Sequence, residues 1–536
     1  MADTRTATET ERKYEGAALP AALDRLPGVA DSARAEPQEL EAVYFDTPDL
    51  RLLRRRITLR RRAGGSDAGW HLKRPLGADA RSEARLPLDG RGPREVPAEF
   101  AAGLAAFTRG AALVPVARLR TRRAEQRLRD EDGRVLARVT EDRVVAEPLA
   151  AAGTSDAPAT VPPDAAPVAG GDNRPPGGGW TEFEIELERG APDLLDHAEA
   201  AFTAAGLTRS AWPSKLAHAL GRTDPPGAPD TAGGARTAGR VVLSGLRTQL
   251  DALLDLDGAV RRGEEDSVHR MRVTARRLRS LLKAHRRLFD RRRSSRLADE
   301  LRWLGRLLGG ARDQEVLADE LLTALTDVPE PMRRGALRAR ITERFSRGYR
   351  HAWQRAVTEL DRPRYFALLD DLEAFLARPP LRRRARRDAA PYLTGVLRRE
   401  QRRTLRRLDL ALDTDPGPGQ DEALHSARKA AKRARYTAEG ARPSLRPGSA
   451  KRAARFARRM KELHKLLGEQ HDSVVVRRTL VALGEENGVD PRHAFAFGVL
   501  HEARRRADED ARSGLPRLRR RAAGRKLARL RRTGTD

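Results

Sequence analysis

The hydrophobic pattern of this 536-residue chain changes its period partway along, and that change limits the folds open to it. Before about residue 222, short stretches such as Trp70–Lys73 and Phe183–Leu187 alternate apolar and polar residues, which is the pattern of half-buried strands. After Gly239, leucine recurs at helical spacing and the alternation is absent. The sequence therefore predicts an α+β protein in which a β domain is followed by an all-α domain.

Two segments rich in proline, alanine and glycine follow neither period. Residues 150–179 lie between two predicted strands, so we interpret them as a disordered insert in the β domain. Residues 224–239 lie where the period changes, so we interpret them as a linker. The predicted domains are residues 1–223 and 240–532.

The composition favours an anionic partner. The net charge of +29 attracts polyanions such as phosphate polymers, nucleic acid or anionic lipid. Only 4% of the residues are aromatic and no recognition-helix or zinc motif is present, so we expect no specific nucleic-acid binding. The chain has no cysteine, which excludes disulfides and thiol nucleophiles. It also lacks a long apolar run, so we expect no membrane span and a cytoplasmic location.

A short acidic and basic motif lies close to the N-terminus. Residues two apart on a strand share a face, so Glu9, Glu11 and Lys13 would project together. Two carboxylates can hold a hard divalent cation, and a lysine beside them can hold a phosphate. The motif therefore indicates a metal-assisted phosphate site.

Further charges alternate along the later strands. Either these charges form an ordinary solvated face, or they line a barrel whose apolar face is covered by helices. A charged lumen must be compensated, because unpaired buried charge is costly. Its excess cations call for an anion and its glutamates for a cation, and a polyphosphate bound to Mg²⁺ or Mn²⁺ satisfies both. The sets are Arg60 and Arg62; His71 and Lys73; Arg81, Glu83 and Arg85; Arg118, Arg120 and Arg122; and Glu182, Glu184, Glu186 and Glu188.

The motifs of the first 222 residues, taken in order, resemble the CYTH domain of the triphosphate tunnel metalloenzyme family. One residue departs from the family pattern, since Arg85 stands where members often carry a second glutamate. The matching motifs are E-x-E-x-K at Glu9, Glu11 and Lys13; Y-F-D-T at Tyr44–Thr47; L-R-x-R at Leu59–Arg62; L-K at Leu72–Lys73; R-x-E at Arg81–Glu83; E-x-E-L at Glu184–Leu187; and S-K at Ser214–Lys215.

The resemblance implies an eight-stranded antiparallel β-barrel that binds a linear triphosphate. Metal polarisation of a phosphoryl group and an in-line water would supply the chemistry. It implies substrate-binding roles for Lys13, Arg60, Arg62, Lys73, Arg81 and Lys215. It implies Mg²⁺ or Mn²⁺ ligands among Glu9, Glu11, Glu83, Asp142, Glu184 and Glu186. The predicted catalytic residues are Glu9, Glu11, Lys13, Glu184 and Glu186.

The helical part contains an internal repeat. The stretch His269–Arg279 matches His425–Arg435, and Leu304–Asp313 matches Leu463–Asp472 in the same order. We therefore predict two homologous halves, about residues 240–390 and 391–532, packed as one helical bundle with a two-fold repeat.

The repeated motifs resemble the CHAD domain, a helical module associated with inorganic polyphosphate. The alternative is a solvated basic helix surface, the usual meaning of a charge run. The resemblance implies that the two basic faces line a common channel. Its predicted polyphosphate-binding residues are His269, Arg272, Arg276, Arg279, His425, Arg428, Lys432 and Arg435.

Together these patterns predict a metal-dependent hydrolase of inorganic triphosphate or short polyphosphate, with a helical domain that binds polyphosphate. Two alternatives stay open. In the first, the protein binds or targets polyphosphate, and the tunnel holds its ligand without turnover. In the second, the protein is a hydrolase or cyclase that acts on an organic triphosphate, such as thiamine triphosphate or a nucleotide.

Overall fold

The computed structural model describes residues 5–88, 92–149, 179–222, 237–327, 335–486 and 489–523. The chain divides into two compact units, Met1–Asp230 and Thr231–Asp536. Most of the predicted insert at 150–179 and of the predicted linker at 224–239 lies outside the described residues, so the exact domain limits remain predictions.

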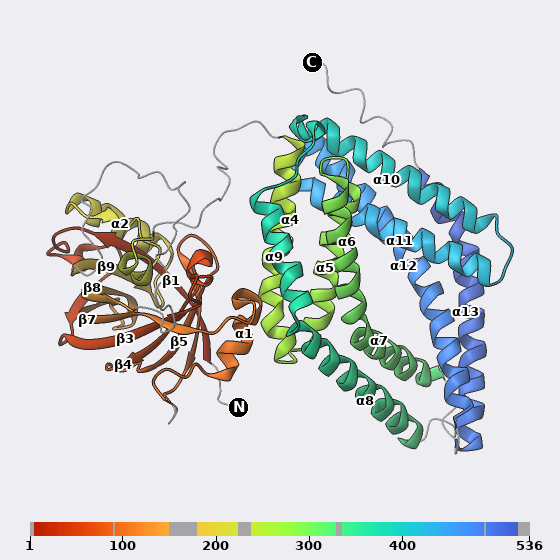
Figure 1. Ribbon diagram of the computed structural model, residues 1–536, viewed down its shortest axis with the longest axis horizontal. Coiled ribbons are helices and arrows are strands. Elements are labelled where there is room, and N and C mark those ends of the chain that lie inside the picture. The colour runs from red at the N-terminus through yellow and green to blue at the C-terminus, as the bar shows by residue number, and fades with distance from the viewer. Residues whose placement is uncertain are drawn as a thin grey trace, which may run out of the picture. The chain divides into compact units, whose positions relative to one another are not determined.

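The first unit is a closed antiparallel barrel (Figure 1). Eight strands pair in the order β1-β6-β5-β4-β3-β7-β8-β9, and β1 also pairs with β9, which closes the sheet. The predicted eight-stranded barrel is thus confirmed. Two short strands add to it, β2 (Asp31–Arg34) on β7 and β10 (Thr208–Arg209) on β1. The barrel strands are β1 (Arg5–Glu15), β3 (Gln38–Asp46), β4 (Thr58–Ala63), β5 (Gly69–Pro75), β6 (Ala80–Leu86), β7 (Val114–Arg129), β8 (Val135–Pro148) and β9 (Trp180–Leu187).

Helices cover parts of the outer face of the barrel, and the residues beneath them are mainly apolar. Helix α2 (Asp193–Ala204) packs on outward residues of β1, β8 and β9, where the rings of Tyr14 and Phe202 meet edge to face at 4.9 Å. Helix α1 (Ala98–Thr108) buries Phe100 and Phe107. Because strand side chains alternate between faces, this apolar exterior leaves the other set of residues for the barrel interior.

A short helix fills part of the interior. Leu216 and Ala217 of α3 (Lys215–Ala219) pack with Leu119 and Val144 in one buried cluster. Val144 has the same strand parity as Asp142, so it faces inward. One part of the lumen is therefore apolar, and the charged residues lie in the rest.

The regular secondary structure in the described residues of the second unit is helical, apart from two isolated β-bridges. Its core includes a cluster from α10–α13, with Leu397, Phe456 and Leu515, and another from α7, α8, α12 and α13. The α-helices are α4 (Ala238–Arg261), α5 (Ser267–Ala284), α6 (Arg291–Leu307), α7 (Gly309–Ala324), α8 (Gly335–Leu360), α9 (Pro363–Ala377), α10 (Ala389–Leu412), α11 (Pro418–Ala441), α12 (Pro447–Gly484) and α13 (Pro491–Ala523). Across the chain, short 3₁₀ turns lie at Leu23–Arg25, Leu53–Arg55, Leu325–Asp327, Arg383–Arg386 and Arg442–Ser444. None of the described helices is long and apolar enough to cross a membrane.

The repeated motifs make equivalent contacts in the two halves. Arg272 on α5 lies 3.2 Å from Asp313 on α7, and Arg428 on α11 lies 3.4 Å from Asp472 on α12. The halves differ at the matched helices, because α6 and α7 are separate whereas α12 is continuous. The two-fold relation between the halves remains a prediction.

Candidate functional site

The register of the first and last barrel strands places the predicted acidic residues side by side. Glu11 pairs with Glu186, and Lys13 pairs with Glu184. Directly paired residues on neighbouring strands share a face, with Cβ atoms about 5 Å apart. Glu9 and Glu11 are only 5% and 6% exposed, so this acidic row is buried in the barrel.

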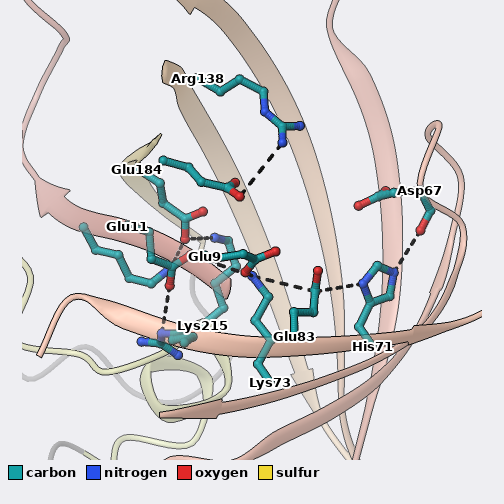
Figure 2. Close-up of polar contacts among 12 residues, drawn as sticks. Glu9, Glu11, Asp67, His71, Lys73, Glu83, Arg138, Glu184 and Lys215 are labelled. Carbon is teal, nitrogen blue, oxygen red and sulfur yellow. Dashed lines mark hydrogen bonds and ion pairs between the residues drawn. The ribbon is translucent and has the colours of Figure 1, made fainter. Parts of the chain in front are cut away.

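Each lumen carboxylate of β1 contacts a cation from another strand. Lys73 Nζ lies 2.5 Å from Glu9 Oε2, and Arg81 Nε lies 2.9 Å from Glu11 Oε1. Lys13 forms an ion pair with Glu184. Figure 2 shows Glu9, Glu11, Lys73 and Glu184 converging from different strands. The interior is thus a mixed lattice of charges rather than a single basic patch.

Lys215 lies at the meeting point of three carboxylates. Its Nζ is 2.6 Å from Glu182 Oε1, 2.7 Å from Glu184 Oε1 and 3.0 Å from Asp142 Oδ2. Arg123 donates two hydrogen bonds to Asp142, at 2.8 and 2.6 Å. Asp142 is fully buried, so these cations supply the charge that its burial requires.

Two arginines of β4 keep a donor without a partner. Arg60 Nη1 lies 3.3 Å from the hydroxyl of Tyr44, and Arg62 forms an ion pair with Asp67. The Nε of each guanidinium is buried without a hydrogen-bond partner among the described residues. A buried unpaired donor is costly, so these groups suit a bound anion.

Burial and neighbouring charge change the proton affinity of the acidic row. Burial, together with nearby Glu83 and Glu186, raises the pKa of Glu9 to about 7 despite Lys73. Burial opposes the charge of Glu11, but Lys13 and Lys73 hold its pKa well below the usual range. Burial also lowers the pKa of Lys13 to about 8. Added positive charge would therefore favour the ionised form of Glu9 most.

The helical unit holds a second group of cations at the contact of α5 and α11. Arg276 and Lys432 have Arg272 and Arg428 as charged neighbours, and His464 of α12 lies beside Lys432. In the part of the chain that the structure describes, Lys432 has no ion-pair partner. Burial and these arginines lower its pKa to about 6. Of this group, Arg272 and Arg428 pair with Asp313 and Asp472, whereas Arg276 and Lys432 have no ion-pair partner among the described residues.

Both predicted histidines also lie in this region. His269 is close to Arg312, and the rings of His425 and His471 are 4.3 Å apart. Arg312 and His471 occupy matched positions of the repeat. The Nδ1 atoms of His269 and His425 have no hydrogen-bond partner among the described residues. Both atoms are buried rather than open to solvent.

Comparison with known proteins decides the family. A CYTH domain model matches residues 7–219, and a CHAD domain model matches residues 244–481. Uncharacterized proteins of two Mycobacterium tuberculosis strains are each 35% identical over 500 residues, 92% of this chain and 92% of theirs. The chain belongs to the family that joins a CYTH domain to a CHAD domain.

Solved structures show lower similarity to this CYTH–CHAD protein. PptA from Streptomyces chartreusis is 20% identical with a TM-score of 0.44, covering 53% of this chain and 99% of that protein. The CHAD domain from the plant Ricinus communis is 23% identical with a TM-score of 0.43, covering 54% of this chain and 92% of that domain.

The donor chemistry of the CYTH lumen suits the divalent cation that its family implies. Carboxylate oxygens are the ligands that Mg²⁺ and Mn²⁺ prefer. Glu9, Glu11, Glu184 and Glu186 lie on adjacent strands and supply such oxygens. Among the described residues, however, no three His, Asp or Glu side chains converge as metal ligands do. A cation at this site would therefore replace contacts that lysine and arginine now make.

The structure brings most predicted CYTH site residues together and adds others. The row Arg118, Arg120 and Arg122 points outward, where Arg120 and Arg122 are 70% and 61% exposed. The lumen cation of β7 is instead Arg123. The feature that identifies Arg123 is its cross-strand pairing with Asp142, and the sequence of one strand alone does not reveal such a pairing. The other lumen residues outside the predicted site set are Tyr44, Asp67, His71, Glu182 and Arg138.

The predicted CHAD set divides into two places. Arg279 has Arg302 and Arg306 of α6 as charged neighbours and lies near Lys429, away from the group around Lys432. Arg435 pairs with Glu439 at 2.7 Å and faces the ring of Tyr436. His464 was absent from the prediction because its matched position in the first half is Gly305.

Proposed function

We propose that the CYTH domain hydrolyses inorganic triphosphate or a short polyphosphate with Mg²⁺ or Mn²⁺, and that the CHAD domain binds longer inorganic polyphosphate. The observation that carries the proposal is the charge arrangement of the closed lumen. Lysines and arginines from several strands alternate there with carboxylates from β1 and β9. A phosphate chain alone would suit the cations, and a metal alone would suit the acids, but this lumen fits both together.

The cations of the lumen would bind the phosphate oxygens. Arg60 and Arg62 offer unpaired donors, and Lys13, Lys73, Arg81 and Lys215 would exchange carboxylate contacts for shorter-lived phosphate contacts. These residues would hold the chain straight and fix the reacting phosphorus, which lowers the entropic part of the barrier. The apolar cluster around α3 would exclude water from the other part of the lumen.

The acidic row would hold the cation and balance its charge. The proposed donors lie among Glu9, Glu11, Glu184 and Glu186. When bound, a divalent cation polarises a phosphoryl group and neutralises charge that develops as the leaving group departs. Asp142 is held by Arg123 and Lys215 instead, so its contacts favour a positioning role over metal binding.

The CHAD proposal rests on Arg276 and Lys432, the two cations of this group that have no ion-pair partner among the described residues. A flexible polyanion can supply the missing negative charge to both helices at once. Replacing both residues with alanine should weaken binding of long-chain polyphosphate to the full-length protein. Competition with duplex DNA at physiological salt should leave the polyphosphate bound, and displacement by DNA would contradict the proposal.

A substrate panel tests the CYTH proposal directly. Full-length protein would be assayed with triphosphate, longer polyphosphate, ATP and thiamine triphosphate, each with Mg²⁺, Mn²⁺ or EDTA. We expect metal-dependent phosphate release that is fastest from triphosphate. Preference for ATP or thiamine triphosphate would favour an organic substrate, and tight binding without turnover would favour a binding protein.

The variant Glu184→Gln sharpens this assay. It removes one donor of the acidic row while preserving side-chain volume. We expect kcat to fall at least about 100-fold, the loss that follows removal of one charge-stabilising group. Glu39→Gln is the matched control, because Glu39 is 78% exposed on the outer face and should keep full activity.

A further inference from the structure

Arg85 of β6 spans two buried carboxylates of the tunnel. Its Nη2 lies 3.1 Å from Glu9 Oε1, and its Nε forms an ion pair with Glu83 Oε2. Glu9 and Glu83 are 5% and 1% exposed, whereas the Arg85 side chain is 45% exposed. One guanidinium therefore reaches in from a more exposed position and supplies positive charge to both acids.

The remaining oxygens of these two acids are also engaged. Lys73 Nζ lies 2.5 Å from Glu9 Oε2, and His71 Nδ1 lies 2.9 Å from Glu83 Oε1. The other ring nitrogen of His71 lies 2.8 Å from the backbone oxygen of Asp67, which fixes the ring. Neither acid thus keeps an oxygen free of a close partner.

The other three acids of the row differ in this respect. Lys73 Nζ lies 3.7 Å from Glu11 Oε2, and Arg123 Nη2 lies 3.7 Å from Glu184 Oε2. Arg138 Nη2 lies 3.9 Å from Oε1 of Glu186, whose side chain is 28% exposed. These three contacts are longer than hydrogen bonds.

The two groups divide the acidic lumen into a part that is already neutralised and a part that is open. The planar guanidinium of Arg85 presents donors in a fixed fork, which suits it to bridge two carboxylates. We propose that Arg85 takes the place of a divalent cation between Glu9 and Glu83, so that Glu83 positions Arg85 and the divalent cation binds only at Glu11, Glu184 and Glu186. This inference rests on the proposed metal-dependent function of the tunnel.

Counting bound Mn²⁺ tests the assignment without reference to turnover. Full-length protein would be titrated with Mn²⁺ alone, and free Mn²⁺ would be followed by its electron paramagnetic resonance signal. Glu83→Gln should bind Mn²⁺ with the number and affinity of the unmodified protein. Glu184→Gln should weaken binding by at least about 10-fold, since even loss of an outer-shell partner has an effect of that size.

Arg85→Glu provides the complementary gain. It would place a third carboxylate beside Glu9 and Glu83, so we expect one additional Mn²⁺ to bind. The matched control is Arg122→Glu, which makes the same charge change at an outer-face residue that pairs with one carboxylate, Glu39, and should add none. Arg85→Gln serves as a second variant if Arg85→Glu does not fold, and it too should bind one additional Mn²⁺. Adding Glu83→Gln to Arg85→Gln should abolish that additional binding.

The possible contrary results separate the two proposals. Loss of Mn²⁺ in Glu83→Gln equal to that in Glu184→Gln would overturn the role of Arg85 while leaving a metal-dependent tunnel intact. So would an Arg85→Glu or Arg85→Gln protein that binds no more Mn²⁺ than Arg122→Glu. If the unmodified protein binds no Mn²⁺ and releases no phosphate, the proposed function itself fails, and this inference fails with it.

Discussion

The CYTH lumen and the CHAD helix contact are both rich in buried cations, but the buried lysine at the centre of each is compensated differently. In the lumen, Lys215 lies within 3.0 Å of three carboxylates. At the CHAD contact, Lys432 has no ion-pair partner among the described residues, and repulsion by the surrounding arginines adds to burial in lowering its pKa to about 6. The lysine of the lumen is balanced within the protein, whereas an external anion would balance that of the CHAD contact.

This difference bears on what each site can bind. A balanced lumen can exchange its internal ion pairs for contacts to a metal and a phosphate chain without a large change in net charge. An unbalanced helix contact gains most from an anion alone, because each bound phosphate relieves repulsion between cations. The same class of ligand is therefore expected at both sites, but with metal only in the tunnel.

The largest expected effect comes from breaking the balance of the lumen. Lys215→Met would leave Glu182, Glu184 and Asp142 without their shared cation. Removing one partner of a buried ion pair costs about 3–5 kcal/mol, so we expect the barrel to lose stability by that amount. Hydrogen–deuterium exchange of β8 and β9 peptides in the full-length protein measures this loss for the barrel alone.

Arg120→Met is the control for that experiment. Arg120 is 70% exposed and its ion pair with Glu41 spans 3.5 Å on the outer face, so exchange should stay unchanged. Equal protection of β8 and β9 in Lys215→Met and the unmodified protein would show that the three carboxylates do not depend on Lys215.

Strand parity explains how much of the lumen could be predicted from the sequence. On β1, the inward row Glu9, Glu11 and Lys13 is wholly charged, so period two was sufficient to find it. On β7, the outward row contains three arginines while the inward row begins with Leu119 and Thr121, so parity favoured the wrong row. Only the pairing of Arg123 with Asp142 identifies the inward cation, and pairing is a tertiary property.

The CHAD group shows a related limit. Helical spacing placed Arg276 and Arg279 on one stripe of α5, which is correct for that helix. The stripe meets different neighbours along its length, since Arg276 lies near Arg428 whereas Arg279 lies near Arg302. A periodic pattern in one helix carries no information about which helix faces each turn, so the division of the predicted set could not be foreseen.

An intermediate effect is expected in the pH dependence of polyphosphate binding. The pKa of Lys432 is about 6 in the free protein, and a bound phosphate would raise it. Binding above pH 6 would therefore take up a proton, and affinity would fall by up to about tenfold per pH unit as pH rises from 6. Below pH 6 the lysine is already charged, and this dependence disappears.

Calorimetry in two buffers of different ionisation enthalpy measures the proton uptake at pH 7. The unmodified protein should take up more protons than Lys432→Met on binding long-chain polyphosphate. Protonation of the polyphosphate ends and of the tunnel is common to both proteins, so the difference belongs to Lys432. Identical uptake would mean that this lysine is charged before the anion binds.

The smallest expected effect has the opposite sign to that of Lys215→Met. Replacing Lys432 with methionine should stabilise the CHAD domain. A lysine whose folded pKa lies below its unfolded value destabilises the fold at every pH below the unfolded value, and most below the folded value, so removing it helps at pH 7. We expect a higher Tm for Lys432→Met, by about 2 °C for each kcal/mol gained in a domain of this size. Thermal unfolding followed at 222 nm measures it, with exposed Lys451→Met as the control. With saturating polyphosphate, the unmodified protein should have the higher Tm, because the bound anion then supplies the counter-charge of Lys432. A lower Tm for Lys432→Met than for the unmodified protein without ligand would contradict the contrast between the two sites.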